Sequence, residues 1–195
     1  MNAASKTPSP WYADYRLHLM VFVVLALFML KAVFGSGGGF SCGGPTTAAN
    51  FKVVGLDGSQ LTLDDLKGKV VFLNFWATWC KPCLREFPAI QNLQKRYADN
   101  PDFQVVAISC DEMPTRGVQE FLARYNRDKA VEPLTFSMYH DTKVEAAAAY
   151  GVSGFPTTFL IDRDGRVVKR FIGPRHWDDK HFFTMVDGIL AAPAN

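Results

Sequence analysis

Two cysteines separated by two residues, Cys80 and Cys83, are the side chains of this sequence best suited to chemistry. Thiol–disulfide exchange needs an accessible thiolate and a second thiol close enough to resolve the mixed disulfide. In the first turn of a helix, residues three apart share a face, and the helix N-terminus stabilises a thiolate. The spacing therefore predicts a redox pair, with Cys80 as the solvent-exposed attacking thiol and Cys83 as the more buried resolving thiol.

The residues around the pair fit this chemistry. Lys81 places a positive charge beside Cys80, which favours the thiolate. Pro82 is tolerated in a first helical turn and stiffens it. Trp79 is expected to be partly exposed and to form part of a substrate-facing surface.

A structural disulfide or half of a zinc site is the other interpretation of the pair. A zinc ribbon needs a second close pair of ligands, and Cys42 and Cys110 are isolated in the sequence. We expect Cys110 to be a buried apolar thiol, and Cys42 to be exposed or to pair between molecules. We expect no metal site, because the remaining candidates are scattered and are interpreted as surface or packing residues: His140, His176 and His181. Metal ligation by His140 together with the cysteine pair is a weaker alternative.

The pair lies where a predicted buried strand gives way to a predicted helix. Residues 70–76 read VVFLNFW, which is apolar apart from Asn74, as in a strand buried on both faces. Beyond the second cysteine, apolar residues recur at helical spacing: Leu84, Phe87, Ile90, Leu93 and Tyr97. This strand-to-helix junction is the context that a redox pair requires.

The remaining sequence from residue 51 onward predicts an α/β domain. Strands and helices alternate, with good turn pairs at Asp57-Gly58 and Asp164-Gly165. The expected strands are 51–54, 60–63, 103–110, 134–138, 157–162 and 166–172. One expected helix begins at 111–114, and two others span 143–150 and 177–190. A strand–helix–strand unit followed by a hairpin and a helix predicts a central mixed sheet with helices on both faces.

A long apolar stretch precedes this domain. Residues 17–34 are nearly long enough to span a bilayer, with charged side chains only at the margins. Aromatic residues before the stretch suit a membrane interface, and Lys6 and Arg16 favour a cytoplasmic N-terminus. We therefore expect a cytoplasmic tail (1–16), a transmembrane signal-anchor (17–34), a Gly-rich linker (35–50) and a domain (51–195) on the periplasmic or extracytoplasmic side of the inner (cell) membrane.

Other interpretations of the apolar stretch are a cleaved signal peptide, a buried core helix or a lipoprotein signal at Cys42. The best cleavage site, Val33-Phe34-Gly35, is poor, and the residues before Cys42 lack the leucine of a lipoprotein site. The net charge of +2, without a basic cluster or phosphate-binding loop, gives no reason to expect nucleic acid binding.

The sequence resembles the thioredoxin superfamily, in particular its membrane-anchored TlpA/ResA-like branch. The matching motifs are GKVV at 68–71, NFWATWC at 74–80, EFP at 86–88 and GFPTTFLID at 154–162. This resemblance implies a thioredoxin fold with an N-terminal β-hairpin and an inserted strand–helix element at about 103–127. It also implies that Pro156 forms a cis peptide bond beside the cysteines and turns the backbone of Phe155 toward an extended substrate. An ordinary trans loop proline is the alternative.

Glu86 matches a carboxylate of the ResA-like branch that lies close to the disulfide. Asn74 stands where thioredoxin itself has a buried acid. A carboxylate at this position could shuttle the proton of Cys83, and its negative charge would weaken thiolate stabilisation, which favours a reductant over an oxidant. The alternative for Glu86 is a solvated acid that stabilises the helix N-terminus.

Together the motifs and the resemblance predict a membrane-tethered thiol-disulfide oxidoreductase with no cofactor beyond a Cys80–Cys83 disulfide. The resemblance implies that it reduces cysteine pairs of exported proteins, such as apocytochrome c or copper sites, and is recycled by a membrane electron donor. Two alternatives stay open: a copper metallochaperone that binds Cu(I) through the pair, and a thiol peroxidase.

Overall fold

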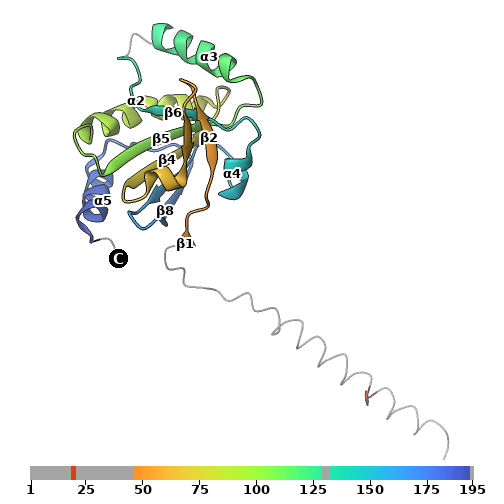
Figure 1. The fold of residues 1–195 in the computed structure, drawn as a ribbon, viewed down its shortest axis with the longest axis vertical. Coiled ribbons are helices and arrows are strands. Elements are labelled where there is room, and N and C mark those ends of the chain that lie inside the picture. The colour runs from red at the N-terminus through yellow and green to blue at the C-terminus, as the bar shows by residue number, and fades with distance from the viewer. Residues whose placement is uncertain (1–18, 21–45, 129–131, 194–195) are drawn as a thin grey trace, which may run out of the picture. The chain divides into compact units, whose positions relative to one another are not determined.

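The computed structural model describes residues 19–20, 46–128 and 132–193. The chain divides into two units, Met1–Gly44 and Pro45–Asn195, and the second unit carries the fold shown in Figure 1. Within the described residues, eight strands form one sheet in the order β1-β8-β7-β4-β5-β6-β2-β3. The strands are β1 (Thr46–Thr47), β2 (Lys52–Gly55), β3 (Gln60–Thr62), β4 (Val70–Trp76), β5 (Phe103–Ser109), β6 (Ser137–His140), β7 (Thr157–Ile161) and β8 (Arg166–Ile172).

Strand β4 occupies the middle of the sheet. It pairs in parallel with β5, from Val70 opposite Phe103 onward, and antiparallel with β7. All residues of β4 are buried, which explains its nearly continuous apolar sequence. The strand that leads into the cysteine pair is therefore held by hydrogen bonds on both edges.

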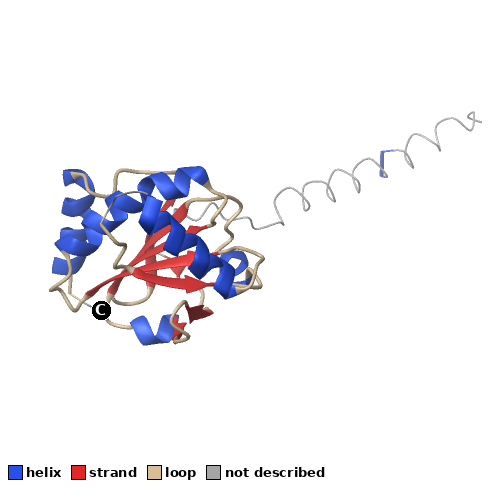
Figure 2. Cartoon of the chain, turned by 90° about the horizontal axis from the view of Figure 1, so that it is seen from above, coloured by secondary structure: helices blue, strands red, loops and turns tan. Residues whose placement is uncertain are grey.

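Helices cover both faces of the sheet, as predicted (Figure 2). Alternate residues of β4 point to opposite faces. On one face, Phe72 and Trp76 pack in a core with residues of α2 (Lys81–Arg96), α3 (Thr115–Asp128) and α5 (Lys180–Ala191). On the other face, Leu73 and Phe75 pack in a second core with residues of η1 (Leu63–Leu66) and α4 (Glu145–Ala149).

Both predicted hairpins are confirmed, as is the mixed sheet. Strands β2 and β3 pair antiparallel around Asp57-Gly58, and β7 and β8 pair antiparallel around Asp164-Gly165. The N-terminal hairpin joins the rest of the sheet through β6. Helix α4 is followed by Gly151, which has the positive φ of 60° that ends many helices.

Three details of the sheet differ from the expectations. The sheet begins at Thr46, since β1 pairs with β8, so the folded domain starts before residue 51. Strand β6 covers Ser137–His140 instead of 134–138, because its register against β5 runs from the pair Val106–Ser137 to the pair Ser109–His140. Strand β5, expected within an inserted element, lies in the middle of the sheet beside β4.

No helix among the residues that the structure describes is long and apolar enough to cross a membrane. The predicted membrane segment, residues 17–34, lies outside those residues apart from Leu19 and Met20.

The core beneath α5 should dominate the stability of the domain. Phe72 is fully buried and packs edge-to-face against Trp177 at 5.0 Å and Phe182 at 5.9 Å between ring centroids. We predict that Phe72→Ala lowers the free energy of unfolding by about 3–5 kcal/mol in denaturant titrations, through lost burial and a cavity. As a matched control, Val168→Ala, at an exposed position of β8, should change the free energy of unfolding by no more than about 0.5 kcal/mol. Equal effects of the two variants would show that this core is not the main source of stability.

Candidate active site

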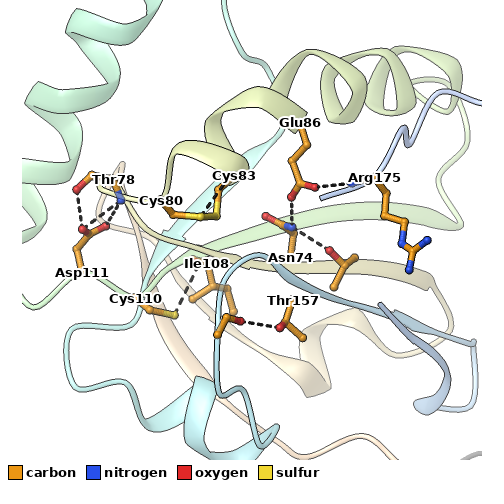
Figure 3. The surroundings of a disulfide bond; sticks show 12 residues. Asn74, Thr78, Cys80, Cys83, Glu86, Ile108, Cys110, Asp111, Thr157 and Arg175 are labelled. Carbon is orange, nitrogen blue, oxygen red and sulfur yellow. Dashed lines mark hydrogen bonds between the residues drawn. A yellow bond between two sulfur atoms is a disulfide. The ribbon is translucent and has the colours of Figure 1, made fainter. Parts of the chain in front are cut away.

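The two cysteines form a disulfide at the start of α2 (Figure 3). Their Cα atoms are 5.3 Å apart, and Cys80 is the N-cap residue of the helix. The Sγ atom of Cys80 accepts a hydrogen bond from the backbone N–H of Cys83 at 3.3 Å. Lys81 begins the helix and is exposed, and Pro82 follows it in the first turn. The sulfur of Cys80 thus receives one of the free N–H groups of the helix start, where negative charge is stabilised.

The expectation that Cys80 is exposed is wrong for this oxidised state. Cys80 is 4% exposed and Cys83 is fully buried. Because the Cys80 sulfur is bonded to a buried partner, its side chain is turned against the helix start and not extended into solvent. Trp79, by contrast, is 69% exposed, as predicted. The residue next to Cys80 in the chain thus lies at the surface, although both cysteines are buried.

The loop before the cysteines is anchored by a buried carboxylate. Asp111 accepts hydrogen bonds from the backbone N–H of Thr78 at 2.9 Å and from its hydroxyl at 2.6 Å. The Ser109 hydroxyl, at the end of β5, donates to the same carboxylate at 2.6 Å. Two strands that end side by side thus hold the loop in one position.

His140 extends this anchor to β6. Its Nε2 lies 2.8 Å from the backbone oxygen of Asp111, and its Nδ1 lies 2.9 Å from the hydroxyl of Thr115. Since a carbonyl oxygen only accepts, Nε2 donates to Asp111. His140 is buried, so the prediction of a packing role is confirmed. Within the described part of the chain, no group of three or more His, Cys, Asp or Glu side chains is placed to hold a metal ion.

A second loop lies beside the disulfide and contains a cis peptide bond between Phe155 and Pro156. The backbone oxygen of Pro156 accepts a hydrogen bond from Gly173 at 2.9 Å, which ties this loop to the end of β8. The ring of Phe155 meets that of Trp79 edge-to-face at 5.8 Å. The predicted cis-proline is confirmed, and the tryptophan next to Cys80 joins the two loops into one apolar surface.

Glu86 lies one helical turn beyond Cys83, and its carboxylate is buried with both oxygens bonded (Figure 3). Oε1 accepts from the Asn74 side-chain nitrogen at 2.9 Å. Oε2 accepts from the Trp177 indole N–H at 3.0 Å and from the backbone N–H of Arg175 at 3.3 Å. The alternative of a solvated helix-start acid is therefore wrong, since Glu86 is only 3% exposed.

Burial sets the protonation behaviour of this carboxyl group. Removal from water raises the pKa of Glu86 to about 7, although the hydrogen bonds from Trp177, Asn74 and Arg175 act in the opposite direction. A cavity of about 450 Å³ opens beside it and is lined by Arg85, Glu86, Ala89, Pro174, Arg175 and His176. Glu86 can therefore hold or release a proton near neutral pH and exchange it with water through this cavity.

Trp177 was expected to begin the last helix, and that assignment is wrong. It precedes α5, whose N-cap is Asp179, and is buried against Phe72 and Phe182 while its indole N–H bonds Glu86. The sequence predicted a helix from Trp177 onward because Trp177 continues the helical spacing of the apolar residues in α5. An indole needs a partner for its N–H when buried, which was the only sequence signal for this contact.

The helix that carries the pair contains Pro88, which cannot donate a hydrogen bond to the backbone oxygen of Leu84. The Tyr125 hydroxyl on α3 donates to that oxygen at 3.0 Å. The backbone oxygen of Leu84 therefore has a hydrogen-bond donor, although helix α2 contains a proline four residues further on.

Cys110 is buried beside β4 and is unpaired, as expected. Burial, together with the negative charges of Asp141 and Asp111, strongly raises the pKa of its thiol. The group therefore stays protonated at neutral pH and is a poor nucleophile.

Comparisons with known proteins agree with this geometry. The Redoxin family model matches residues 43–186. The chain belongs to the Redoxin family. It is 37% identical over 155 residues to "Thiol-disulfide oxidoreductase ResA" of Bacillus subtilis (strain 168), covering 80% of each chain. It is 41% identical over 126 residues to the protein of the same name from Bacillus thuringiensis (strain Al Hakam), covering 65% of this chain and 68% of that one.

Among solved structures, this Redoxin-family chain is similar to a "putative Thiol:disulfide interchange protein DsbE" from Chlorobium tepidum. The TM-score is 0.66 at 35% identity, with 77% of this chain and 100% of the other covered. The predicted thioredoxin-like fold and ResA-like relationship are confirmed. With the Cys80–Cys83 disulfide, these relationships make the protein a thiol-disulfide oxidoreductase.

The buried Glu86 should make stability depend on pH in a defined window. The native state keeps the Glu86 proton up to a pKa of about 7, whereas the unfolded chain releases it near the ordinary value of 4.5. The stabilising contribution is thus complete below about pH 4.5 and is lost as the pH rises to about 7.

We predict that the free energy of unfolding of the wild type falls, relative to Glu86→Gln, by on the order of 3 kcal/mol across this window. Denaturant titrations of both proteins from pH 4 to pH 8 measure this difference. A difference that stays constant over this range would mean that folding does not shift the pKa of Glu86.

Proposed function

We propose that this oxidoreductase is a membrane-tethered reductant of cysteine pairs in exported proteins. The observation that carries the proposal is the Cys80–Cys83 disulfide at the start of α2 with a buried carboxyl group, Glu86, one turn further along. The cysteine pair carries the two electrons in its dithiol form and becomes the disulfide when it gives them up, so the proposal needs no other cofactor. The remaining support comes from the electrostatics of the helix and from the sequence before the domain.

In the proposed mechanism the reduced enzyme acts on a substrate disulfide. The thiolate of Cys80 attacks one substrate sulfur, which forms a mixed disulfide and releases the other substrate sulfur as a thiolate. Cys83 then loses its proton and attacks Cys80, which releases the second substrate thiolate and forms the enzyme disulfide. Glu86 takes the proton of Cys83, and its pKa of about 7 suits a group that must both accept and release a proton near neutral pH.

The surface formed by Trp79, Phe155 and Pro156 receives the substrate in this proposal. The rings of Trp79 and Phe155 are in contact, and the cis peptide bond changes the direction of the chain at Pro156. An extended substrate segment can pair with the backbone of Phe155, as in strand addition. Lys81 and Pro82 follow Trp79 and Cys80 in the chain, in the first turn of α2, and we propose that they border the same surface.

The direction of electron flow follows from thiolate stabilisation. Strongly oxidising pairs owe their potential to a stabilised reduced form. Here the helix start favours the Cys80 thiolate, whereas an ionised Glu86 opposes negative charge on Cys83. A potential near that of thioredoxin, about −270 mV, supports a reductant, and one near DsbA, about −120 mV, would contradict it.

A reductant requires a membrane electron donor to renew the dithiol, and the resemblance to the ResA-like branch favours apocytochrome c or copper-site cysteines as substrates.

The two cysteines should respond differently to substitution. We predict that Cys80→Ser abolishes reduction of a disulfide peptide, because the attacking sulfur is lost. Cys83→Ser should instead accumulate a mixed disulfide that non-reducing electrophoresis detects, because the resolving thiol is lost. Cys110→Ser is the matched control and should keep its activity, since that thiol is buried and unpaired. Full activity in both Cys80→Ser and Cys83→Ser would refute the mechanism.

We propose that residues 17–34 anchor the domain in the inner (cell) membrane, with the N-terminus in the cytoplasm and the domain on the outer side. Leu19 to Leu30 is wholly apolar, and a Gly-rich stretch follows it. An arginine at the centre of a membrane span costs about 2.5–3.5 kcal/mol.

We predict that the full-length protein stays with membranes after alkaline extraction, and that Leu25→Arg with Leu27→Arg releases a large share of it. Val168→Arg, on the surface of the domain, is the matched control and should leave the distribution unchanged. Release of a shortened wild-type chain would instead show that the segment is cleaved.

A further inference from the structure

Asn74 lies on the face of the sheet that supports the start of α2. It is fully buried on β4 between Phe72 and Trp76, which pack in the same core as Cys83. Because residues two apart on a strand point to the same face, the side chain of Asn74 faces the helix that carries Cys83 and Glu86. Its bond to Glu86 at 2.9 Å confirms this direction.

The amide nitrogen of Asn74 has no free hydrogen. One hydrogen goes to Oε1 of Glu86 at 2.9 Å and the other to the hydroxyl oxygen of Thr158 at 2.9 Å. An amide nitrogen carries only two hydrogens, so these bonds fix the orientation of the group. The side-chain oxygen must therefore point away from both partners.

That oxygen is buried and has no hydrogen-bond partner among the residues that the structure describes. A buried acceptor without a partner costs about 1–3 kcal/mol, and native structures keep few of them. In the view of Figure 3 the oxygen points to the side on which Cys83 lies, while the nitrogen points to Glu86. The oxygen is therefore free to accept a hydrogen bond from a donor on the side of Cys83.

Reduction of the disulfide supplies such a donor. A dithiol reductant transfers two electrons and two protons, which breaks the Cys80–Cys83 bond, produces two S–H groups and converts the reductant into a disulfide. A cysteine without its disulfide bond can donate through S–H. Cys83 and Glu86 are three residues apart on α2 and share a helix face, so the new S–H group arises on the face that already contacts Asn74.

We propose that Asn74 is a positioning residue whose side-chain oxygen accepts a hydrogen bond from the Cys83 thiol in the reduced enzyme. The proposal rests on the assignment of Cys83 as the resolving thiol. The Asn74 oxygen then accepts from the Cys83 thiol, while the Asn74 nitrogen donates to Glu86. One side chain thus positions both the thiol and the carboxylate that takes the thiol's proton. The bond forms only after reduction, so Asn74 shifts the equilibrium toward the dithiol.

The first test measures the thiol–disulfide equilibrium of the full-length protein in detergent against mixtures of reduced and oxidised dithiothreitol. We expect Asn74→Leu to lower the equilibrium constant for reduction about tenfold, which corresponds to about 30 mV for a two-electron couple. Trp177→Phe is the matched control, because it also removes one hydrogen bond from the Glu86 carboxylate but leaves the Asn74 oxygen in place. It should shift the constant by less than twofold. Equal shifts in the two variants, or no shift in Asn74→Leu, would overturn the proposal.

The second test observes the thiol directly. The infrared S–H stretching band of Cys83, assigned by its loss in Cys83→Ser, should lie at lower frequency in the reduced wild type than in Asn74→Leu. Thr158→Val removes one partner of the amide nitrogen but keeps the bond to Glu86 that orients the group, so the band should stay near its wild-type position. An identical band in wild type and Asn74→Leu would refute the hydrogen bond.

If Asn74→Leu does not fold, Asn74→Ala serves for both measurements. Both read the enzyme's own thiols without a protein substrate. They can therefore fail while Cys80→Ser still abolishes peptide reduction, which separates a failure of this inference from a failure of the proposed function.

Discussion

The arrangement of the site depends on the hydrogen bonds that the buried carboxylate of Glu86 accepts. Its three hydrogen bonds come from Asn74 on β4, Trp177 and the backbone of Arg175, so one side chain of α2 joins the central strand to the segment before α5. Burying a carboxyl group is unfavourable unless its oxygens are bonded, and here each donor comes from a distant part of the chain. The site can therefore exist only when the sheet, α2 and the C-terminal segment are assembled together.

A second buried carboxylate holds the opposite side of the disulfide. Asp111 binds the backbone and hydroxyl of Thr78, and its own backbone oxygen is bonded by His140 at the end of β6. The loop before Cys80 is thus fixed from β5 and β6, while the helix after Cys83 is fixed through Glu86. Exchange between sulfurs depends on which sulfur is accessible and how it is oriented, and the two carboxylates set this geometry from either side.

Local patterns were enough to predict the central strand, the helix after it, the two hairpins and the cysteine pair. These features depend on periodicity and on short turn motifs, which nearby residues determine. The contact between Trp177 and Glu86 joins residues 91 positions apart, and no periodicity encodes such a pairing. The low exposure of Cys80 was missed for a related reason: helix position indicates which face a residue occupies, whereas burial depends on the loops that pack beside it.

The proposed mechanism also explains how two thiols three residues apart can have different roles. The helix N-terminus acts most strongly on its first residues, so it favours negative charge on Cys80, the N-cap residue. Cys83 lies within the helix, fully buried, and one turn from a carboxylate that opposes a second negative charge. The same helix therefore favours a thiolate at one cysteine and a neutral thiol at the other. The exchange reaction needs this difference, because the resolving thiol must stay protonated until the mixed disulfide has formed.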